Sequence, residues 1–343
     1  ESIIDFFESR GVKLKEEDHG RMFPVSNKAQ DVVDTLVSTI NEQQVTVKEE
    51  TAVTRLSVND NGIFTVETSQ QTYEANSVII ATGGTSVPQT GSTGDGYRFA
   101  ESMGHTITEL FPTEVPITSP ERFIKDKTLK GLSLKDVELS VLKKNGKKRI
   151  SHQMDMIFTH FGVSGPAALR CSQFVYKEQK NQKKNEILMS LDAFPELNQE
   201  ELTQQIRRML KEQPDKFIKN SLHGLIEERY LLFILEQANI DNETTSHHLS
   251  NQQLTTIVNL LKGFTFKVNG TLPIDKAFVT GGGVSLKEIE PKTMMSKLVT
   301  GLFLCGEVLD IHGYTGGYNI TSALVTGHVA GLNAGKHNTL KNN

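Results

Sequence analysis

Two short apolar runs that end abruptly in glycine constrain the fold more than any other feature of the chain. One is residues 77–84 (SVIIATGG) and the other is residues 302–307 (LFLCGE). Short continuous apolar runs are typical of strands buried in a parallel sheet. Open α/β sheets bind their ligands where the carboxyl ends of such strands meet. The sequence therefore predicts an α/β fold in which two strands, far apart along the chain, end at one binding edge.

The second run continues into a glycine-dense loop (residues 313–317) and a predicted helix. Glycines let backbone N–H groups approach phosphate or ring oxygens, and the positive end of a helix dipole stabilises negative charge there. A carboxylate at the strand end, Glu307, can accept hydrogen bonds from sugar hydroxyls. These features favour a dinucleotide ligand, although on this stretch alone Glu307 could equally be a solvated loop residue. Farther along, glycines at every fourth position predict close packing of the helix on a strand: Gly327, Gly331 and Gly335.

The spacing of apolar residues predicts the elements of the first hundred residues. Residues 1–10 have the pattern of an amphipathic helix. Ser26 is the expected N-cap of a second helix that ends near Ile40. A β-meander is expected to follow, with strands at 45–48, 53–58, 64–68 and 72–74.

From about residue 111 the pattern changes to the alternation typical of β-strands. A helix opened by Ser164 and Pro166 interrupts it, and the polar residues 177–184 are expected to form a solvated loop. The chain is therefore predicted to divide into three parts: an α/β domain (1–110 and 273–343), a β-rich insertion (111–195 and 263–272) and a helical subdomain (196–262).

Composition limits the classes of partner. The 343 residues are 37% hydrophobic and carry a formal net charge of −4, so no strong field gathers nucleic acid or a membrane surface. No apolar run approaches the ~18 residues that span a bilayer. Cys171 and Cys305 form no CxxC pair, which indicates a reducing cytoplasm and no zinc site. We expect a cytoplasmic protein with a small-molecule substrate, no nucleic-acid or membrane partner and no metal; the oligomeric state stays open.

Five blocks, in order along the chain, resemble one bacterial family: 21–29 (RMFPVSNKA), 78–97, 158–167 (FTHFGVSGPA), 279–298 and 301–323. It is the YhiN-like, or aminoacetone-oxidase-like, family of NAD(P)/FAD-dependent oxidoreductases. The resemblance implies a two-part, Rossmann-like FAD-binding domain of the glutathione-reductase type, interrupted by a mixed-β, barrel-like insertion with a helical subdomain. It also implies a flavoprotein that passes electrons between NAD(P)H and a small organic substrate.

The resemblance further implies which residues contact FAD. The expected contacts, in order from the adenine to the flavin ring, are Ala52 and Val53; Thr82, Gly83 and Gly84; Gly306 and Glu307; and Gly317, Tyr318, Asn319 and Ile320. The family's N-terminal G-x-G-x-x-G strand-turn-helix is absent from this sequence, since Gly94-Asp95-Gly96 lacks the third glycine and follows a loop. We therefore expect an N-terminally truncated chain, and whether it retains FAD is open.

Three residues are candidates for a proton-transfer role beside a flavin. His160 lies in the block THFGVSG, and His312 and Tyr314 flank the glycine loop. A histidine titrates near neutrality and can act as an acid or base. The structural alternatives are that His160 only orders its loop and that the aromatic ring of Tyr314 only packs.

Other residues have simpler interpretations. Ser164 is expected to cap its own helix, and Cys305 to be a small buried side chain. The side chains of His247 and His248 are expected to point apart in an exposed loop, which makes a poor metal site. Arg21 could pair with a phosphate, a substrate carboxylate or an acidic neighbour.

Two rival functions remain. Some relatives of this fold act on tRNA, which raises the possibility of an RNA-modifying flavoprotein; the near-neutral charge and the lack of a basic, aromatic-studded surface argue against it. The other rival is a catalytically inactive fragment whose insertion folds alone.

Overall fold

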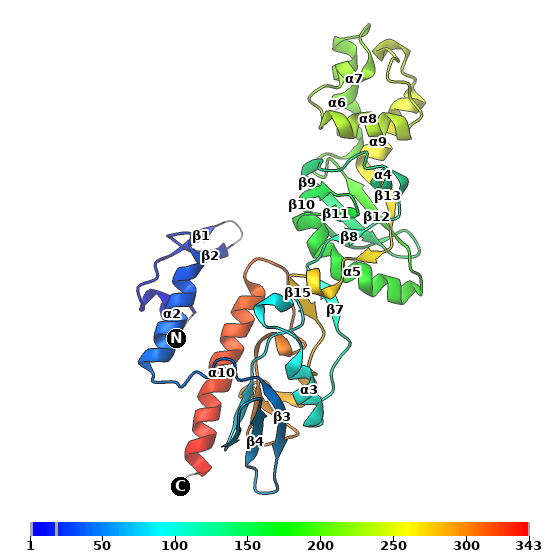
Figure 1. Ribbon diagram of the computed structural model, residues 1–343. Helices are drawn as coiled ribbons and strands as arrows, with labels where there is room; N and C mark the ends of the chain where they lie inside the picture. The colour runs from blue at the N-terminus through cyan, green and yellow to red at the C-terminus, as the bar shows by residue number, and fades with distance from the viewer. Residues whose placement is uncertain (1–2, 18–19, 342–343) are drawn as a thin grey trace. The chain divides into compact units, whose positions relative to one another are not determined.

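The computed structural model describes residues 3–17 and 20–341 (Figure 1). The chain forms two compact units, which are considered separately below. The first contains residues 1–110 and 279–343, and the second contains residues 111–278.

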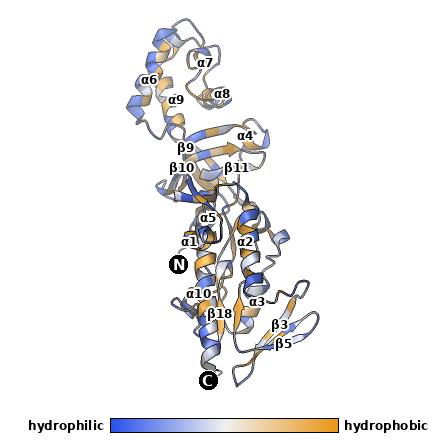
Figure 2. Ribbon diagram, turned by 90° about the vertical axis from the view of Figure 1, so that its left-hand side faces the viewer, coloured by the Kyte–Doolittle hydropathy of each residue, from blue (hydrophilic) through white to orange (hydrophobic). Residues whose placement is uncertain are grey.

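The first unit is built on a four-stranded sheet of order β16-β17-β18-β6. Strand β6 (Val78–Ile80) pairs in parallel with β18 (Leu302–Leu304), as their continuous apolar sequences predict. Strands β17 (Met295–Ser296) and β16 (Ile289–Glu290) continue the sheet in antiparallel fashion. β18 is buried and hydrophobic along its length (Figure 2).

Helix α10 (Tyr318–Lys341) contacts both β6 and β18. Its buried residues include Ala330 and Ala334. The expectation that its glycines permit this packing is wrong. A Cβ atom on Gly327, Gly331 or Gly335 would meet nothing within 4 Å, so the small alanines make the close contact instead.

The meander forms a separate three-stranded sheet: β3 (Val53–Val58), β4 (Phe64–Thr68) and β5 (Thr72–Ala75). The strand expected at 45–48 is not formed. Val45 and Val47 are more than half exposed in an irregular segment, because no neighbouring strand pairs with them. The unit also contains α3 (Asp95–Ser102) and the short strand β15 (Val279–Gly281).

The N-terminal segment holds α1 (Ile3–Glu8), a hairpin of β1 (Leu14–Glu17) and β2 (Arg21–Pro24), and α2 (Ala29–Glu42). The hairpin was not expected from the sequence. Residues 1–2 of the expected first helix lie outside the described residues. Ser26 is not the N-cap of α2: Lys28 occupies that position, and the Ser26 hydroxyl donates to the Asp31 carboxylate.

The second unit contains a seven-stranded antiparallel sheet of order β13-β12-β9-β10-β11-β8-β14. The strands are β8 (Ile117–Thr118), β9 (Ser133–Leu142), β10 (Lys148–Phe158), β11 (Gly162–Ser164), β12 (Ile187–Asp192), β13 (Phe264–Val268) and β14 (Gly270–Thr271). Strand β7 (Phe111–Thr113) and α4 (Arg122–Lys125) belong to the same unit. The strand order does not close on itself, so the barrel-like description stays a prediction.

Helix α5 (Pro166–Gln182) packs on β9 and β10 through buried residues such as Cys171 and Val175. Two expectations about it are wrong. Gly165, and not Ser164, is its N-cap, because Ser164 is still part of strand β11. The helix also runs through Lys177 and Lys180, which were expected in a loop, because Glu178 is buried and anchors this stretch through Arg149.

The helical pattern of residues 196–262 corresponds to α6 (Gln199–Glu212), α8 (Glu228–Gln237) and α9 (Asn251–Gly263), and a further short helix, α7 (Ile218–Ser221), was not expected. Capping boxes open two of them, Asn198 with Glu201 for α6 and Ser250 with Gln253 for α9.

Candidate functional site

The parallel pair β6–β18 brings the two glycine-rich strand ends together. Leu304 lies opposite Ile80, and the backbone N–H of Cys305 donates to the Ile80 carbonyl at 3.1 Å. The segments 81–84 and 306–307 therefore leave the sheet at the same edge. A Cβ atom on Gly84 would lie 3.2 Å from Cδ of Glu307 and would overlap the Thr280 hydroxyl.

Thr280 joins the two segments. Its hydroxyl oxygen accepts hydrogen bonds from the backbone N–H groups of Thr85 (2.9 Å) and Ser86 (3.0 Å). Its own backbone N–H donates to Oε1 of Glu307 at 2.6 Å. Thr280 is fully buried, so these bonds form away from competing water. Thr280 was not expected from the sequence, because a single threonine at a strand end gives no pattern.

The Gly306 turn is fixed to helix α10. Gly306 has a φ of +74°, a value that favours glycine, and its N–H donates to the Thr326 hydroxyl at 2.9 Å. Thr326 in turn donates to the Ser322 carbonyl one turn earlier in the helix. The strand end that carries Glu307 is thus held in register with α10.

Asn319 organises the loop before α10. Its Oδ1 accepts from the Gly313 N–H at 2.8 Å, and its Nδ2 donates to the carbonyls of Gly313 (3.0 Å) and Tyr314 (3.3 Å). The N-terminus of α10, just before Asn319, is open. A Cβ atom on Gly317 would meet nothing within 4 Å, and Tyr318 and Ile320 are 61% and 68% exposed.

Tyr97 adds a buried hydroxyl to this region. The Tyr97 residue is only 7% exposed. Among the described residues, its hydroxyl has no hydrogen-bond partner. Burial, and then the negative charges of Glu307 and Asp310, raise the pKa of Tyr97. The phenol therefore stays protonated and keeps a proton to donate. A buried donor without a partner is costly, and a ligand acceptor would remove that cost.

The other predicted residues lie in different places. Ala52 and Val53 stand at the start of β3, in a sheet separate from that of β6 and β18. Nδ1 of His312 lies 3.8 Å from Oδ1 of Asp310 in the same unit as Glu307. His160 belongs to the second unit, where it is exposed after β10 and packs edge-to-face on Phe161.

The structure also places the remaining residues that the sequence singles out. Cys305 is buried, as expected, and Arg21 begins β2 with its guanidinium 5.4 Å from the Phe23 ring centre. The rings of His247 and His248 are exposed but do not point apart: their centres are 3.9 Å apart. Each ring is instead held locally, His247 by the Pro214 carbonyl and His248 by the Thr245 hydroxyl. Within the described residues no group of three or more His, Cys, Asp or Glu could hold a metal.

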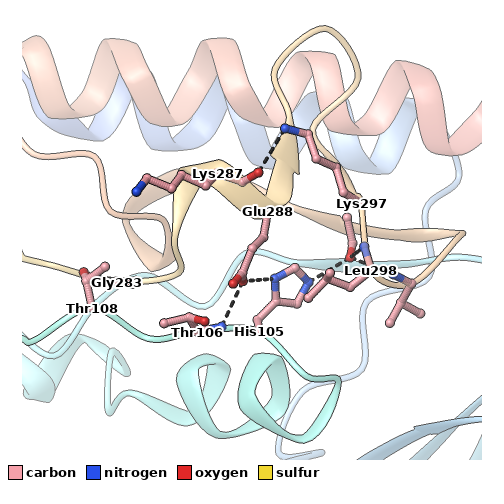
Figure 3. A network of polar contacts seen from close by, with 10 residues as sticks. His105, Thr106, Thr108, Gly283, Lys287, Glu288, Lys297 and Leu298 are labelled. Atoms are coloured by element: carbon pink, nitrogen blue, oxygen red, sulfur yellow. Dashed lines mark hydrogen bonds and ion pairs between the residues drawn. The ribbon is translucent and has the colours of Figure 1, made fainter.

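A second polar network was not expected from the sequence (Figure 3). Nδ1 of His105 lies 3.0 Å from Oε2 of Glu288, and Nε2 lies 2.8 Å from Oγ of Ser296. The order Ser-His-Glu is that of a hydrolytic triad. Ser296, however, is only 2% exposed, and its oxygen accepts from the N–H groups of Leu298 and Val299. The network therefore ties the end of α3 to the β16–β17 hairpin and does not present a nucleophile.

No helix in the described part of the chain combines the length and the apolar character needed to cross a membrane.

Comparison with known proteins gives consistent matches along nearly the whole chain. The family model described as "HI0933-like protein Rossmann domain" matches residues 1–333. A ribosomal RNA dihydrouridine synthase of Haemophilus influenzae is 28% identical over 333 residues, which cover 96% of this chain and 78% of that protein. A 3-dehydro-bile acid delta(4,6)-reductase of Clostridium scindens is 28% identical, over 96% of this chain and 78% of that protein. A ribosomal RNA dihydrouridine synthase of Escherichia coli is 28% identical, over 92% and 74%.

Proposed function

The chain belongs to the HI0933-like Rossmann-domain family, and on that basis we propose that it is an FAD-dependent oxidoreductase. One observation carries the proposal: Gly84 and Glu307 meet at the carboxyl edge of the parallel β6–β18 pair. This is the edge at which doubly wound sheets bind dinucleotides. More specifically, we propose that the protein belongs to the YhiN-like subgroup and that its FAD-binding domain is of the two-part glutathione-reductase type.

The residues present suit FAD. Oε1 of Glu307 accepts from Thr280, which leaves Oε2 as an acceptor for a ribityl or ribose hydroxyl. Gly83 and Gly84 keep the first strand end free of side chains. The open N-terminus of α10 at Gly317 offers partial positive charge, and the Tyr97 hydroxyl offers a protonated donor. When bound, FAD supplies two-electron redox chemistry.

We further propose that the substrate carries a carbon–carbon double bond and that NAD(P)H is the electron source. A relative named delta(4,6)-reductase and two named dihydrouridine synthase support this, because both names describe the addition of hydrogen across such bonds. His312 is the better candidate for the proton donor, since it lies in the same unit as Glu307, whereas His160 does not.

A second candidate, reduction of a base in RNA, rests on the names of two relatives. In that form the protein's substrate is a nucleic acid and not a small organic molecule. A cytoplasmic location fits both candidates and stays a proposal.

The test is anaerobic titration of the purified chain, reconstituted with FAD, against NADH and NADPH. The proposal expects flavin absorbance that bleaches on addition of one of the two nucleotides and returns when a conjugated acceptor is added. Protein that takes up no FAD would contradict the cofactor and support the inactive-fragment alternative. Protein that takes up FAD but is not bleached by either nucleotide would contradict the electron donor alone.

A further inference from the structure

A cluster of positive charge lies at one end of the seven-stranded sheet. Residues 143–149 (KKNGKKR) carry five cations and no carboxylate; 143–147 form the turn between β9 and β10, and Lys148 and Arg149 begin β10. The end of α5 and Lys267 on β13 add further lysines. We call the following set the basic rim: Lys143, Lys144, Lys147, Lys148, Arg149, Lys183, Lys184 and Lys267.

The fold brings these separate segments together. Strand β12 pairs with β9 on one side and with β13 on the other, so that Leu188 lies opposite Lys267. The Gln182 side chain at the end of α5 donates to the Leu142 carbonyl at 3.2 Å, where β9 ends. A hollow of about 520 Å³ results, and Lys143, Lys144, Lys184 and Lys267 are among its lining residues.

The positive charge of the basic rim is not neutralised by its neighbours. Three carboxylates pair with members of the rim: Glu138 with Lys148, Glu178 with Arg149 at 3.2 Å, and Glu186 with Lys267 at 3.5 Å. Among the described residues, the eight cations of the rim therefore exceed their three paired carboxylates by five positive charges, in a chain whose net charge is −4. The expectation of no nucleic-acid partner rested on that net charge, which averages over the chain and hides this cluster.

Folding does not require this arrangement. The turn itself needs Asn145 and Gly146, whereas Lys143, Lys144 and Lys147 are exposed around it. Exposed ion pairs contribute little to stability, and like charges held close together oppose it. A lysine on an edge strand can guard against aggregation, which is a sufficient explanation for Lys267 on β13. It does not explain the three exposed lysines of the turn, Lys143, Lys144 and Lys147.

The chemistry of the rim fits an extended polyanion. Flexible lysines in an open hollow suit several phosphates in a row better than one tightly held phosphate, for which arginine forks are preferred. The hollow's lining contains no aromatic residue on which a base could stack. Such a surface would contact the backbone and set the position of a nucleic acid without reading its sequence.

We propose that the basic rim binds the phosphate backbone of RNA. The biological meaning of this binding rests on the RNA-directed form of the proposed function, in which the substrate is a nucleic acid. Binding itself requires no flavin, so the two can be tested separately.

The experiment measures fluorescence anisotropy of a labelled ribosomal RNA fragment with the flavin-free protein over a range of salt concentrations. The variant is Lys143→Glu/Lys144→Glu/Lys147→Glu. The matched control reverses three exposed lysines elsewhere in the second unit, Lys125→Glu/Lys211→Glu/Lys216→Glu, and so has the same net charge. Thermal unfolding establishes that both variants remain folded, and Lys→Gln versions repeat the comparison with a milder change.

We expect the rim variant to lose affinity by at least about tenfold, while the control loses less than about twofold. The slope of log K against log salt should also fall by about two to three, because each lost phosphate contact removes ~0.7–0.9 from it. Equal losses in both variants, or wild-type binding that does not depend on salt, would overturn the proposal. Wild-type protein that binds phosphatidylserine vesicles but not RNA, with vesicle binding lost in the rim variant, would overturn the proposal in favour of a membrane surface. Failure of FAD uptake with intact RNA binding would count against the proposed function only.

Discussion

Gly84 and Glu307 lie against each other at the carboxyl ends of β6 and β18, so closely that a Cβ atom at position 84 would be 3.2 Å from Cδ of Glu307. Thr280 fills the remaining space and bonds to both sides of the contact. The glycine is therefore required by the packing of the protein itself. The same packing leaves one carboxylate oxygen of Glu307 available at the edge where a dinucleotide would lie.

Replacing Gly84 with alanine should destabilise the first unit. The new Cβ atom would overlap the Thr280 hydroxyl, and overpacking of this kind costs about 1–3 kcal/mol. Gly327→Ala is the matched control, because that Cβ atom would meet nothing within 4 Å and alanine favours the helix by about 0.5–1 kcal/mol. In urea unfolding, the midpoint should be lower than that of the wild type for Gly84→Ala and higher for Gly327→Ala. An unchanged midpoint for Gly84→Ala would contradict the packing described here.

Glu307→Gln tests the carboxylate as a cofactor ligand. The amide can still accept from the Thr280 N–H, but its second hydrogen-bonding atom is a donor and the negative charge is gone. A lost hydrogen bond to a charged group is worth about 1.5–3 kcal/mol, so FAD affinity should fall by roughly tenfold or more. Flavin fluorescence titration measures this. Glu74→Gln, on an exposed position of β5, is the control and should bind FAD like the wild type.

Tyr97→Phe should separate stability from cofactor binding. Removing a buried hydroxyl that has no described partner should leave the free energy of unfolding unchanged or raise it by up to about 1 kcal/mol. If the hydroxyl donates to FAD, the same change should weaken FAD binding. Urea unfolding without flavin and titration with flavin supply the two values. Loss of stability without loss of FAD affinity would show that the hydroxyl serves the fold alone.

Glu288 should make stability depend on pH in the acidic range. Hydrogen bonds from Thr106, first from its side chain and also from its backbone N–H, together with contacts from His105, lower the pKa of Glu288 below its ordinary value of 4.5. Because the folded pKa is below the unfolded one, the stabilisation is complete above about pH 4.5 and is lost as pH falls through the folded pKa. Wild type and Glu288→Gln should therefore differ most in urea midpoint near neutral pH and converge in acid. A difference that stays constant with pH would contradict this, and Glu74→Gln again serves as the surface control.

The sequence predicts the strands of the candidate site well and its polar contacts poorly. The runs at 77–81 and 302–304 predict buried strands, and the structure contains both as paired parallel strands, although β6 is only partly buried, with Ile79 39% exposed. Thr280, Thr326 and His105 act through partners far away along the chain, and no local pattern marks such residues.

Local sequence patterns also predicted the wrong secondary structure where a pairing strand was absent or where a long-range contact is not visible in the sequence. Val45 and Val47 alternate like a strand, but no neighbouring strand pairs with them. Residues 177–182 are polar enough for a loop, yet the buried Glu178 and its contact with Arg149 keep them helical. The basic run at 143–149 is visible in the sequence, but its proximity to Lys184 and Lys267 depends on the pairing of β9, β12 and β13.

The structure of the FAD complex tests the central claim most directly. A crystal of the protein grown with FAD should show the cofactor along Gly83 and Gly84, with a ribityl or ribose hydroxyl within hydrogen-bonding distance of the Glu307 carboxylate. FAD bound elsewhere, with the Glu307 carboxylate facing only solvent, would contradict it.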